Sequence, residues 1–179
     1  MTVVVRDYDP QWVRDFEKLR ERIWPVIEDF AVAIEHVGST SVPGLAAKPI
    51  IDLDVIVRSD EGVLLAIERL TAIDYAYRGN LGIAGREAFR AAVNDPAHNL
   101  YVCRSDSAAL HDHLVFRDYL RAHPKTAQIY GVLKRDLARQ YSDDVDRYAQ
   151  SKTDFITGVL EAAGIARSRI DHIRRENGL

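Results

Sequence analysis

One stretch of the sequence restricts the fold more than any other. Residues 50–57, IIDLDVIV, are apolar and mostly β-branched at every position except Asp52 and Asp54. Such a run is typical of a strand that is buried on both faces in the centre of a sheet. Burying two unpaired carboxylates side by side is costly, because each loses its hydration. The sequence therefore predicts a central strand whose acidic pair needs a compensating partner.

A bound cation is the simplest partner for this pair. Residues i and i+2 of a strand point to the same face, ~6–7 Å apart along the backbone, so Asp52 and Asp54 can converge on one or two divalent ions. Carboxylate oxygens suit Mg²⁺ or Mn²⁺. Taken alone, the pair also fits a second interpretation, in which one aspartate lies at the strand end and pairs with a lysine or arginine.

Composition narrows the class of protein. The chain has 179 residues, of which 47% are hydrophobic and 28% charged, in the range of a single folded domain (1–179). Its formal net charge of −3 lacks the positive field of a nonspecific nucleic-acid binder, so nucleic acid is a disfavoured partner. Cys103 is the only cysteine, and the sequence has neither a secretory signal pattern nor an apolar run long enough to span a bilayer. We expect a cytoplasmic protein with no membrane partner.

The remaining pattern predicts an α+β arrangement, with a sheet core at about 31–104 followed by C-terminal helices at about 107–168. Asp9 and Ser59 are suited to cap the first two helices, and Pro124 separates two later ones. The charged tail from Arg167 onward is expected to fray. The predicted strands are 3–5, 31–37, 50–57, 87–93 and 98–103, and the predicted helices are 10–27, 59–73, 108–122, 125–141 and 145–163.

Gly38-Ser39 follows the predicted strand 31–37 and precedes the acidic strand. A glycine turn between a strand and a helix exposes backbone N–H groups that can bind a phosphate beside the serine hydroxyl. The dipeptide alone is weak evidence. Its combination with the Asp-x-Asp strand, with residues 40–51 between Ser39 and Asp52, predicts that phosphate donors and metal ligands face one cleft.

The segment 35–54, EHVGSTSVPGLAAKPIIDLD, resembles the signature of the GrpB family, also called UPF0157. The resemblance extends to Tyr8-Asp9-Pro10-x-Trp12, HNLYV at 98–102, FRDYLR at 116–121, Tyr130 and Leu133-Lys134, so it covers nearly the whole chain. It implies the nucleotidyltransferase superfamily fold, a polymerase-β palm-like mixed sheet with flanking helices and a C-terminal helical layer.

The resemblance also implies a function. In the superfamily the Gly-Ser turn binds a nucleoside triphosphate and the Asp-x-Asp strand holds catalytic metal, roles that fall here on Gly38, Ser39, Asp52 and Asp54. It implies a nucleotidyltransferase that depends on Mg²⁺ or Mn²⁺ and uses a nucleoside triphosphate and a small acceptor. The alternative is a non-catalytic nucleotide-binding, CoA-binding or partner module, because related sequences occur fused to dephospho-CoA kinase and suggest a link to coenzyme A metabolism.

The superfamily usually adds a third carboxylate, and the strand 98–102 offers none. Glu87 and Glu35 are the nearest candidates. His98 is a predicted metal ligand or base, with a structural hydrogen bond as the alternative. His111-Asp112-His113 is not predicted to bind metal, because positions i and i+2 of a helix lie far around the cylinder.

Basic residues supply a further set of predicted nucleotide contacts. Arg117 and Arg121 lie four residues apart on a helix, and Lys134 and Lys152 each follow a tyrosine by four positions. Lys48 precedes the acidic strand. These side chains could bind phosphates, or they could form a solvated or salt-bridged face in which tyrosines cover the lysine stems.

Overall fold

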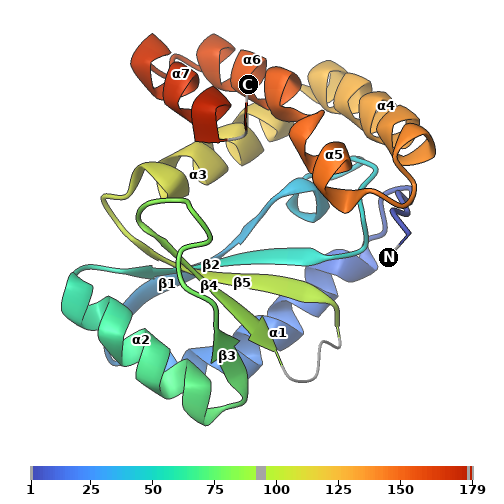
Figure 1. Ribbon diagram of the computed structural model, residues 1–179. Coiled ribbons are helices and arrows are strands. Elements are labelled where there is room, and N and C mark those ends of the chain that lie inside the picture. The colour runs from blue at the N-terminus through green and yellow to red at the C-terminus, as the bar shows by residue number, and fades with distance from the viewer. Residues whose placement is uncertain (1, 92–95, 177, 179) are drawn as a thin grey trace.

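The computed structural model describes residues 2–91, 96–176 and 178. Within this part of the chain, five strands form one sheet in the order β1-β2-β5-β4-β3, in which only the β2–β5 pair is parallel. Figure 1 shows α1 and α2 on one side of the sheet and α3 to α7 on the other. In chain order the elements are α1 (Gln11–Ile27), β1 (Ala31–Val37), the short 3-10 helix η1 (Ser39–Ser41), β2 (Ile51–Val57), α2 (Asp60–Ala72), β3 (Tyr75–Tyr77), β4 (Arg86–Ala91), β5 (His98–Arg104), α3 (Ala108–Ala122), α4 (Pro124–Gln140), α5 (Val145–Gln150), α6 (Thr153–Ala162) and α7 (Arg167–Glu176).

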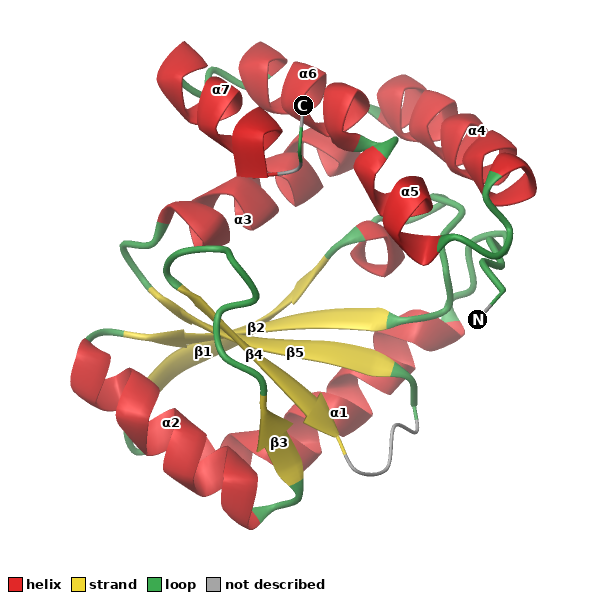
Figure 2. Ribbon diagram, in the orientation of Figure 1, coloured by secondary structure: helices red, strands yellow, loops and turns green. Residues whose placement is uncertain are grey.

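The sheet with its flanking helices and its C-terminal helical layer confirms the predicted α+β class (Figure 2). β2 divides its side chains between two environments. Leu53 and Val55 lie in the main core with Ile23 of α1, whereas Ile56 packs against Leu110 of α3. Because side chains alternate along a strand, the two aspartates share the face of Ile56. The acidic pair therefore points toward the C-terminal helical layer.

The predicted starts of the first two helices are close to the observed ones. The Asp9 carboxylate accepts a hydrogen bond from the backbone N–H of Gln11 at 2.8 Å, and Ser59 Oγ accepts one from Gly62 at 3.3 Å. The predicted strand at 3–5 is wrong. The chain there makes a single bridge between Arg6 and Ala47, because it crosses the turn before β2 rather than joining a sheet edge.

The C-terminal half differs from the sequence pattern in two places. The predicted helix 145–163 is instead two helices: α5 ends at Gln150 and α6 begins at Thr153. The predicted frayed tail is the helix α7, in which Ile170 and Ile173 are buried against Leu160. Two apolar residues three positions apart suffice to dock a strongly charged helix.

The middle of the sheet was predicted in part. β5 agrees with the predicted strand, and β4 agrees with 87–93 as far as Ala91, since residues 92–93 lie outside the described residues. β3 was not predicted, because Tyr75-Ala76-Tyr77 is too short to show an alternating pattern. Among the described helices, none is both long and apolar enough to cross a membrane.

Candidate functional site

The turn after β1 brings backbone against the acidic strand. Gly38 has φ +69° and ψ −172°, a conformation that is essentially restricted to glycine. A Cβ at this position would lie 2.1 Å from Asp52 Oδ2, so only a residue without a side chain allows this approach. Ser41 Oγ donates a hydrogen bond to Gly38 O at 2.6 Å, which fixes the turn. The predicted Gly-Ser turn therefore adjoins the predicted acidic pair.

Asp52 and Asp54 have different surroundings. Asp52 Oδ1 accepts a hydrogen bond from Asn99 Nδ2 at 2.8 Å, and burial raises the pKa of Asp52 even though this bond opposes the shift. Asp54 is fully buried, and its Oδ2 contacts His113 Nδ1 at 2.7 Å. Its Oδ1 has no hydrogen-bond partner within the described part of the chain. A buried carboxylate oxygen without a partner is unusual, and a water or a cation would satisfy it.

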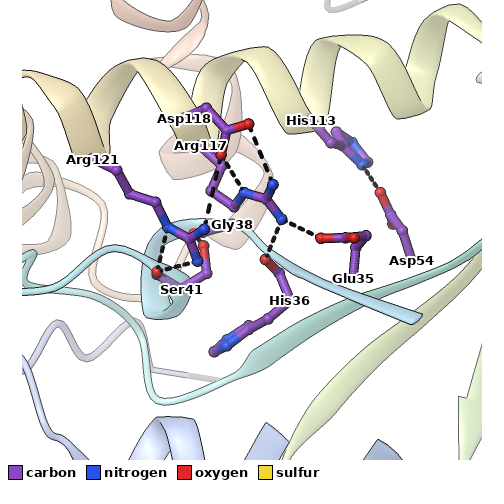
Figure 3. A network of polar contacts seen from close by, with 9 residues as sticks. All are labelled: Glu35, His36, Gly38, Ser41, Asp54, His113, Arg117, Asp118 and Arg121. Carbon is purple, nitrogen blue, oxygen red and sulfur yellow. Dashed lines mark hydrogen bonds and ion pairs between the residues drawn. The ribbon is translucent and has the colours of Figure 1, made fainter. Parts of the chain in front are cut away.

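His113 is a member of this site that the sequence analysis missed. It projects from α3 toward Asp54, as Figure 3 shows. Burial alone would lower the pKa of His113, but the hydrogen bond and the charge of Asp54 outweigh it and raise that pKa. Asp112, the residue before it, has a different partner, since its Oδ2 accepts hydrogen bonds from Arg169. The signal that could have found His113 is its position one helical turn before Arg117.

The neighbouring strand β5 places no third carboxylate beside the pair. Asn99 and Tyr101 of β5 lie in register beside Asp52 and Asp54. Glu35 of β1 is in register with Asp54 on its other side, but it is held by Arg117, and Glu87 accepts a hydrogen bond from Tyr77 at 2.6 Å. No group of three or more His, Cys, Asp or Glu side chains among the described residues could hold a metal ion.

The two aspartates nevertheless fit a magnesium ion of the kind that binds with a nucleotide. Mg²⁺ is commonly held by one or two carboxylates, with substrate phosphates and water completing its shell. The unpartnered Asp54 Oδ1 and the exposed part of Asp52 would supply such carboxylate ligands. The donor set therefore suits a cation that arrives with a phosphate ligand better than one bound by protein alone.

His98 is not part of this group. It is buried, its Nε2 contacts Tyr75 Oη at 2.8 Å, and its Nδ1 contacts Pro96 O at 2.7 Å. It precedes Asn99 on β5, so its side chain lies on the opposite face of the sheet from the one that holds Asp52. The metal role predicted for His98 is corrected to the structural hydrogen bond that was its alternative.

Three lysines surround a small polar cavity of about 170 Å³, which we call the lysine cavity. Lys134 is only 2% exposed, and its Nζ has no hydrogen-bond partner among the described residues. Its Nζ atom lies 4.5 Å from the centre of the Tyr130 ring, and burial lowers the pKa of Lys134 to about 6. The cavity is lined by Ser39, Thr40, Lys48, Ile50, Asp52, Asn99, Lys134, Tyr148 and Lys152.

The other two lysines share an aromatic neighbour. The Nζ atoms of Lys152 and Lys48 lie 4.5 and 5.7 Å from the centre of the Tyr148 ring. Burial, reinforced by the charge of Lys48, lowers the pKa of Lys152 to about 8. A cavity that is lined by three lysines, one of them strongly desolvated, is suited to bind a polyanion.

A second cavity of about 360 Å³ adjoins the first, and we call it the large cavity because it is the larger of these two. Ser39, Asp52 and Lys152 line both cavities, so the two meet at the serine of the Gly-Ser turn and at Asp52, the first residue of the acidic pair. The large cavity extends from there between the sheet and helices α3, α6 and α7. Its remaining lining is Val37, Gly38, Ile83, Arg86, Tyr101, Ala109, Asp112, His113, Phe116, Tyr130, Ile156, Leu160, Arg169, Ile173 and Glu176.

Arg117 and Arg121 line neither of these two cavities, and their role as nucleotide contacts stays a prediction. Arg117 donates to Glu35 at 2.6 Å and to His36 O at 3.1 Å, and Arg121 donates to Ser41 O at 2.8 Å (Figure 3). These bonds join α3 to the end of β1 and to η1. The two arginines thus support the Gly-Ser turn from the side of α3.

Replacing Arg117 with methionine should therefore affect folding more than ligand binding. The side chain is 10% exposed and its loss leaves Glu35 and a backbone carbonyl without their donor, so we expect a loss of about 2 kcal/mol in the free energy of unfolding. Urea denaturation measures this loss. The control is Arg20→Met, at an exposed position of α1, for which we expect a change below about 0.5 kcal/mol in the free energy of unfolding. If the folded Arg117→Met protein lost only nucleotide affinity, the structural role would be wrong.

The sheet, the Gly-Ser turn and the acidic strand together define a fold class. A structure of the Cid1 poly(U) polymerase with Mg 3′-dATP bound aligns with a TM-score of 0.57 at 14% identity, over 83% of this chain and 50% of that one. At this identity the likeness concerns the fold alone. The chain has a nucleotidyltransferase fold, as the sequence predicts.

Within that class, the chain belongs to the GrpB family: residues 2–162 match the family model described as GrpB protein. UPF0157 protein YqkA of Bacillus subtilis is 42% identical over 156 residues, which are 87% of this chain and 46% of YqkA, so the chain spans about half the length of that relative. The crystal structure of conserved protein GrpB from Enterococcus faecalis aligns with a TM-score of 0.81 at 38% identity, over 89% of this chain and 96% of that one.

A protein named dephospho-CoA kinase, from Mycolicibacterium paratuberculosis, is 27% identical over 169 residues, which are 80% of this chain and 42% of that protein. The match therefore concerns part of a longer protein.

Proposed function

We propose that this protein binds a nucleoside triphosphate at the junction of the two cavities and transfers its nucleotidyl group to a small acceptor. The observation that carries the proposal is the buried amine of Lys134, which faces the lysine cavity and has no hydrogen-bond partner among the described residues. A phosphate oxygen would supply the missing acceptor. Lys48 and Lys152 would share the remaining charge, and Gly38 and Ser39 would bind phosphate through backbone N–H groups and the hydroxyl.

Asp52 and Asp54 would hold Mg²⁺ or Mn²⁺ together with the phosphates, and the unpartnered Asp54 Oδ1 supports this assignment. The ion would neutralise negative charge on the phosphates and on the attacking and leaving oxygens. His113 would keep Asp54 in place by bonding its second oxygen. The solved Cid1 structure of the same fold contains Mg 3′-dATP, in keeping with this chemistry.

The transfer would form a bond between an acceptor oxygen and the α-phosphorus, release pyrophosphate and free the acceptor's proton. Because Asp52 lies where the two cavities meet, the proposal places the phosphates in the lysine cavity and the acceptor in the large cavity. Holding both substrates in one orientation would account for much of the rate.

A second candidate is a non-catalytic module that binds a nucleotide or CoA and serves a partner enzyme. The observation that favours it is the presence of Asn99 and Tyr101, rather than an acid, beside the aspartates. The similarity to part of a dephospho-CoA kinase is the reason to include CoA among the ligands to test.

Isothermal calorimetry with ATP and with CoA, each with and without Mg²⁺, tests these proposals. For the native protein we expect ATP binding that Mg²⁺ strengthens at least tenfold. We expect the Asp52→Asn/Asp54→Asn variant to lose this dependence on Mg²⁺, because its amides cannot balance the ion's charge. The matched control is Glu21→Gln/Asp146→Asn, which also removes two carboxylates, both exposed and outside the two cavities.

Each alternative outcome is distinct. Binding of CoA that is indifferent to Mg²⁺ and to the two aspartates would replace the transferase proposal with the module. No binding of either ligand would reject both.

A further inference from the structure

The large cavity has an uneven character that limits what it can accept. Most of its wall away from the acidic pair is apolar, with Phe116, Ile156, Leu160 and Ile173 supplied by α3, α6 and α7. Its volume of about 360 Å³ is at the lower end of the range for small-molecule sites. A compact ligand with an apolar body fits this wall.

Arg86 is the polar group of this cavity that lacks a counter-ion. Its guanidinium lies 4.4 Å from the centre of the Tyr101 ring, and its Nε is buried without a hydrogen-bond partner in the described part of the chain. A guanidinium stacked on a ring keeps its N–H donors free in its own plane, where they match two oxygens of one anionic group. The arrangement leaves donors in place and supplies no acceptor for them.

The backbone holds Arg86 in this position. It is the first residue of β4 and follows Gly85, which has φ +76° and where a Cβ would lie 2.9 Å from Ser107 Cβ. Arg86 is in register with Cys103 of β5, on the face of the sheet that also presents Tyr101. The side chain is therefore directed over the same face as the acidic pair.

The other cationic side chains that line the cavity each have a neighbour that accounts for them. Arg169 donates to Asp112 Oδ2 at 2.6 and 2.8 Å, and His113 is bonded to Asp54. Lys152 stacks on Tyr148 and belongs equally to the lysine cavity. Among the described residues, Arg86 is thus the cation that belongs to the large cavity alone and makes no hydrogen bond or ion pair there.

We propose that the large cavity binds an acceptor with an apolar body and one anionic group, a carboxylate, sulfonate or phosphate, and that Arg86 recognises this group through its free guanidinium edge. The description of this ligand as an acceptor rests on the proposed function. The binding itself, of an anion with an apolar body at Arg86, can be tested without turnover.

Two fluorescent probes with nearly the same apolar body separate the charge from the body: 8-anilinonaphthalene-1-sulfonate, which is an anion, and N-phenyl-1-naphthylamine, which is neutral. For the native protein under folding conditions we expect the sulfonate to bind at least tenfold more tightly. We expect Arg86→Gln to remove this preference and to leave the affinity for the neutral probe within about threefold. Arg86→Lys should keep only part of the preference for the sulfonate, since an ammonium cannot form the paired hydrogen bonds of a guanidinium.

Arg90→Gln is the matched control, because Arg90 is exposed on the same strand and lines neither cavity; it should keep the full preference. Saturating ATP with Mg²⁺ should leave the sulfonate bound. Equal affinities of the native protein for the two probes, or an unchanged preference in both Arg86 variants, would overturn the inference. Displacement of the sulfonate by ATP, with weaker ATP binding in Arg86→Gln, would assign Arg86 to the nucleotide instead. A protein that binds the sulfonate through Arg86 and never binds ATP would refute the proposed function and keep this site.

Discussion

Replacing Lys134 with methionine should make the protein more stable and abolish tight binding of a nucleoside triphosphate. Burial lowers the pKa of Lys134 from 10.5 to about 6, so at pH 7 the folded protein holds a neutral amine that is protonated in the unfolded chain. Each unit of pKa shift corresponds to ~1.4 kcal/mol, and after relaxation of the site we expect a gain of roughly 2–4 kcal/mol from methionine. Affinity for ATP should fall about 100-fold, because a phosphate bound beside Lys134 would favour the protonated amine, and the variant loses the charge-assisted bond that results.

The dependence on pH gives the same prediction a second readout. Between about pH 6 and 10.5 the unfolded chain binds more protons at Lys134 than the folded protein, so this group makes native stability rise with pH. The Lys134→Met variant should lack this part of the rise in urea denaturation measured at several pH values. Lys125→Met, exposed on the same helix, is the control and should keep it. A variant that is less stable than the native protein at pH 7 would show that Lys134 has a partner in the folded state.

Replacing Gly38 with alanine should have the largest effect on the acidic pair. The backbone conformation of Gly38 costs another residue about 1–3 kcal/mol, and the new Cβ would displace the carboxylate of Asp52 from a position 2.1 Å away. We expect a loss of roughly 3 kcal/mol in the free energy of unfolding. Binding of ATP with Mg²⁺ should be lost even where the protein remains folded.

Gly158→Ala is the control for this change. Gly158 lies within α6 and a Cβ there would meet no atom within 4 Å, so alanine should leave stability unchanged or raise it by up to about 1 kcal/mol. Calorimetry with ATP measures the effect of each variant on binding, and thermal unfolding measures its effect on stability. Native nucleotide affinity in Gly38→Ala would contradict the close approach of turn and aspartate.

The sequence predicts the parts of this protein that are encoded locally. A run of β-branched residues with two acids defines β2, and the resemblance carried by residues 35–54 leads to the right fold and family. Ser59 caps its helix as its type suggests. In each case the signal lies within a few residues of the feature.

The parts that sequence reasoning missed depend on contacts between distant segments. His113 reaches Asp54 across 59 positions, and Arg117 reaches Glu35 across 82. A helix with several polar residues does not reveal which of them face a sheet and which face solvent. His98 was misplaced for a related reason, because a one-residue shift along a strand moves a side chain to the other face.

The lysine cavity draws its charges from both layers of the molecule. Asp52 and Lys48 come from the sheet and the segment before it, whereas Lys134 and Lys152 come from the helical layer. A polyphosphate bound here would act as an electrostatic clamp between the two layers, so occupancy of the cavity and docking of the helices on the sheet would be thermodynamically linked. The repulsion among the lysines, which opposes docking in the free protein, would become attraction to a shared ligand.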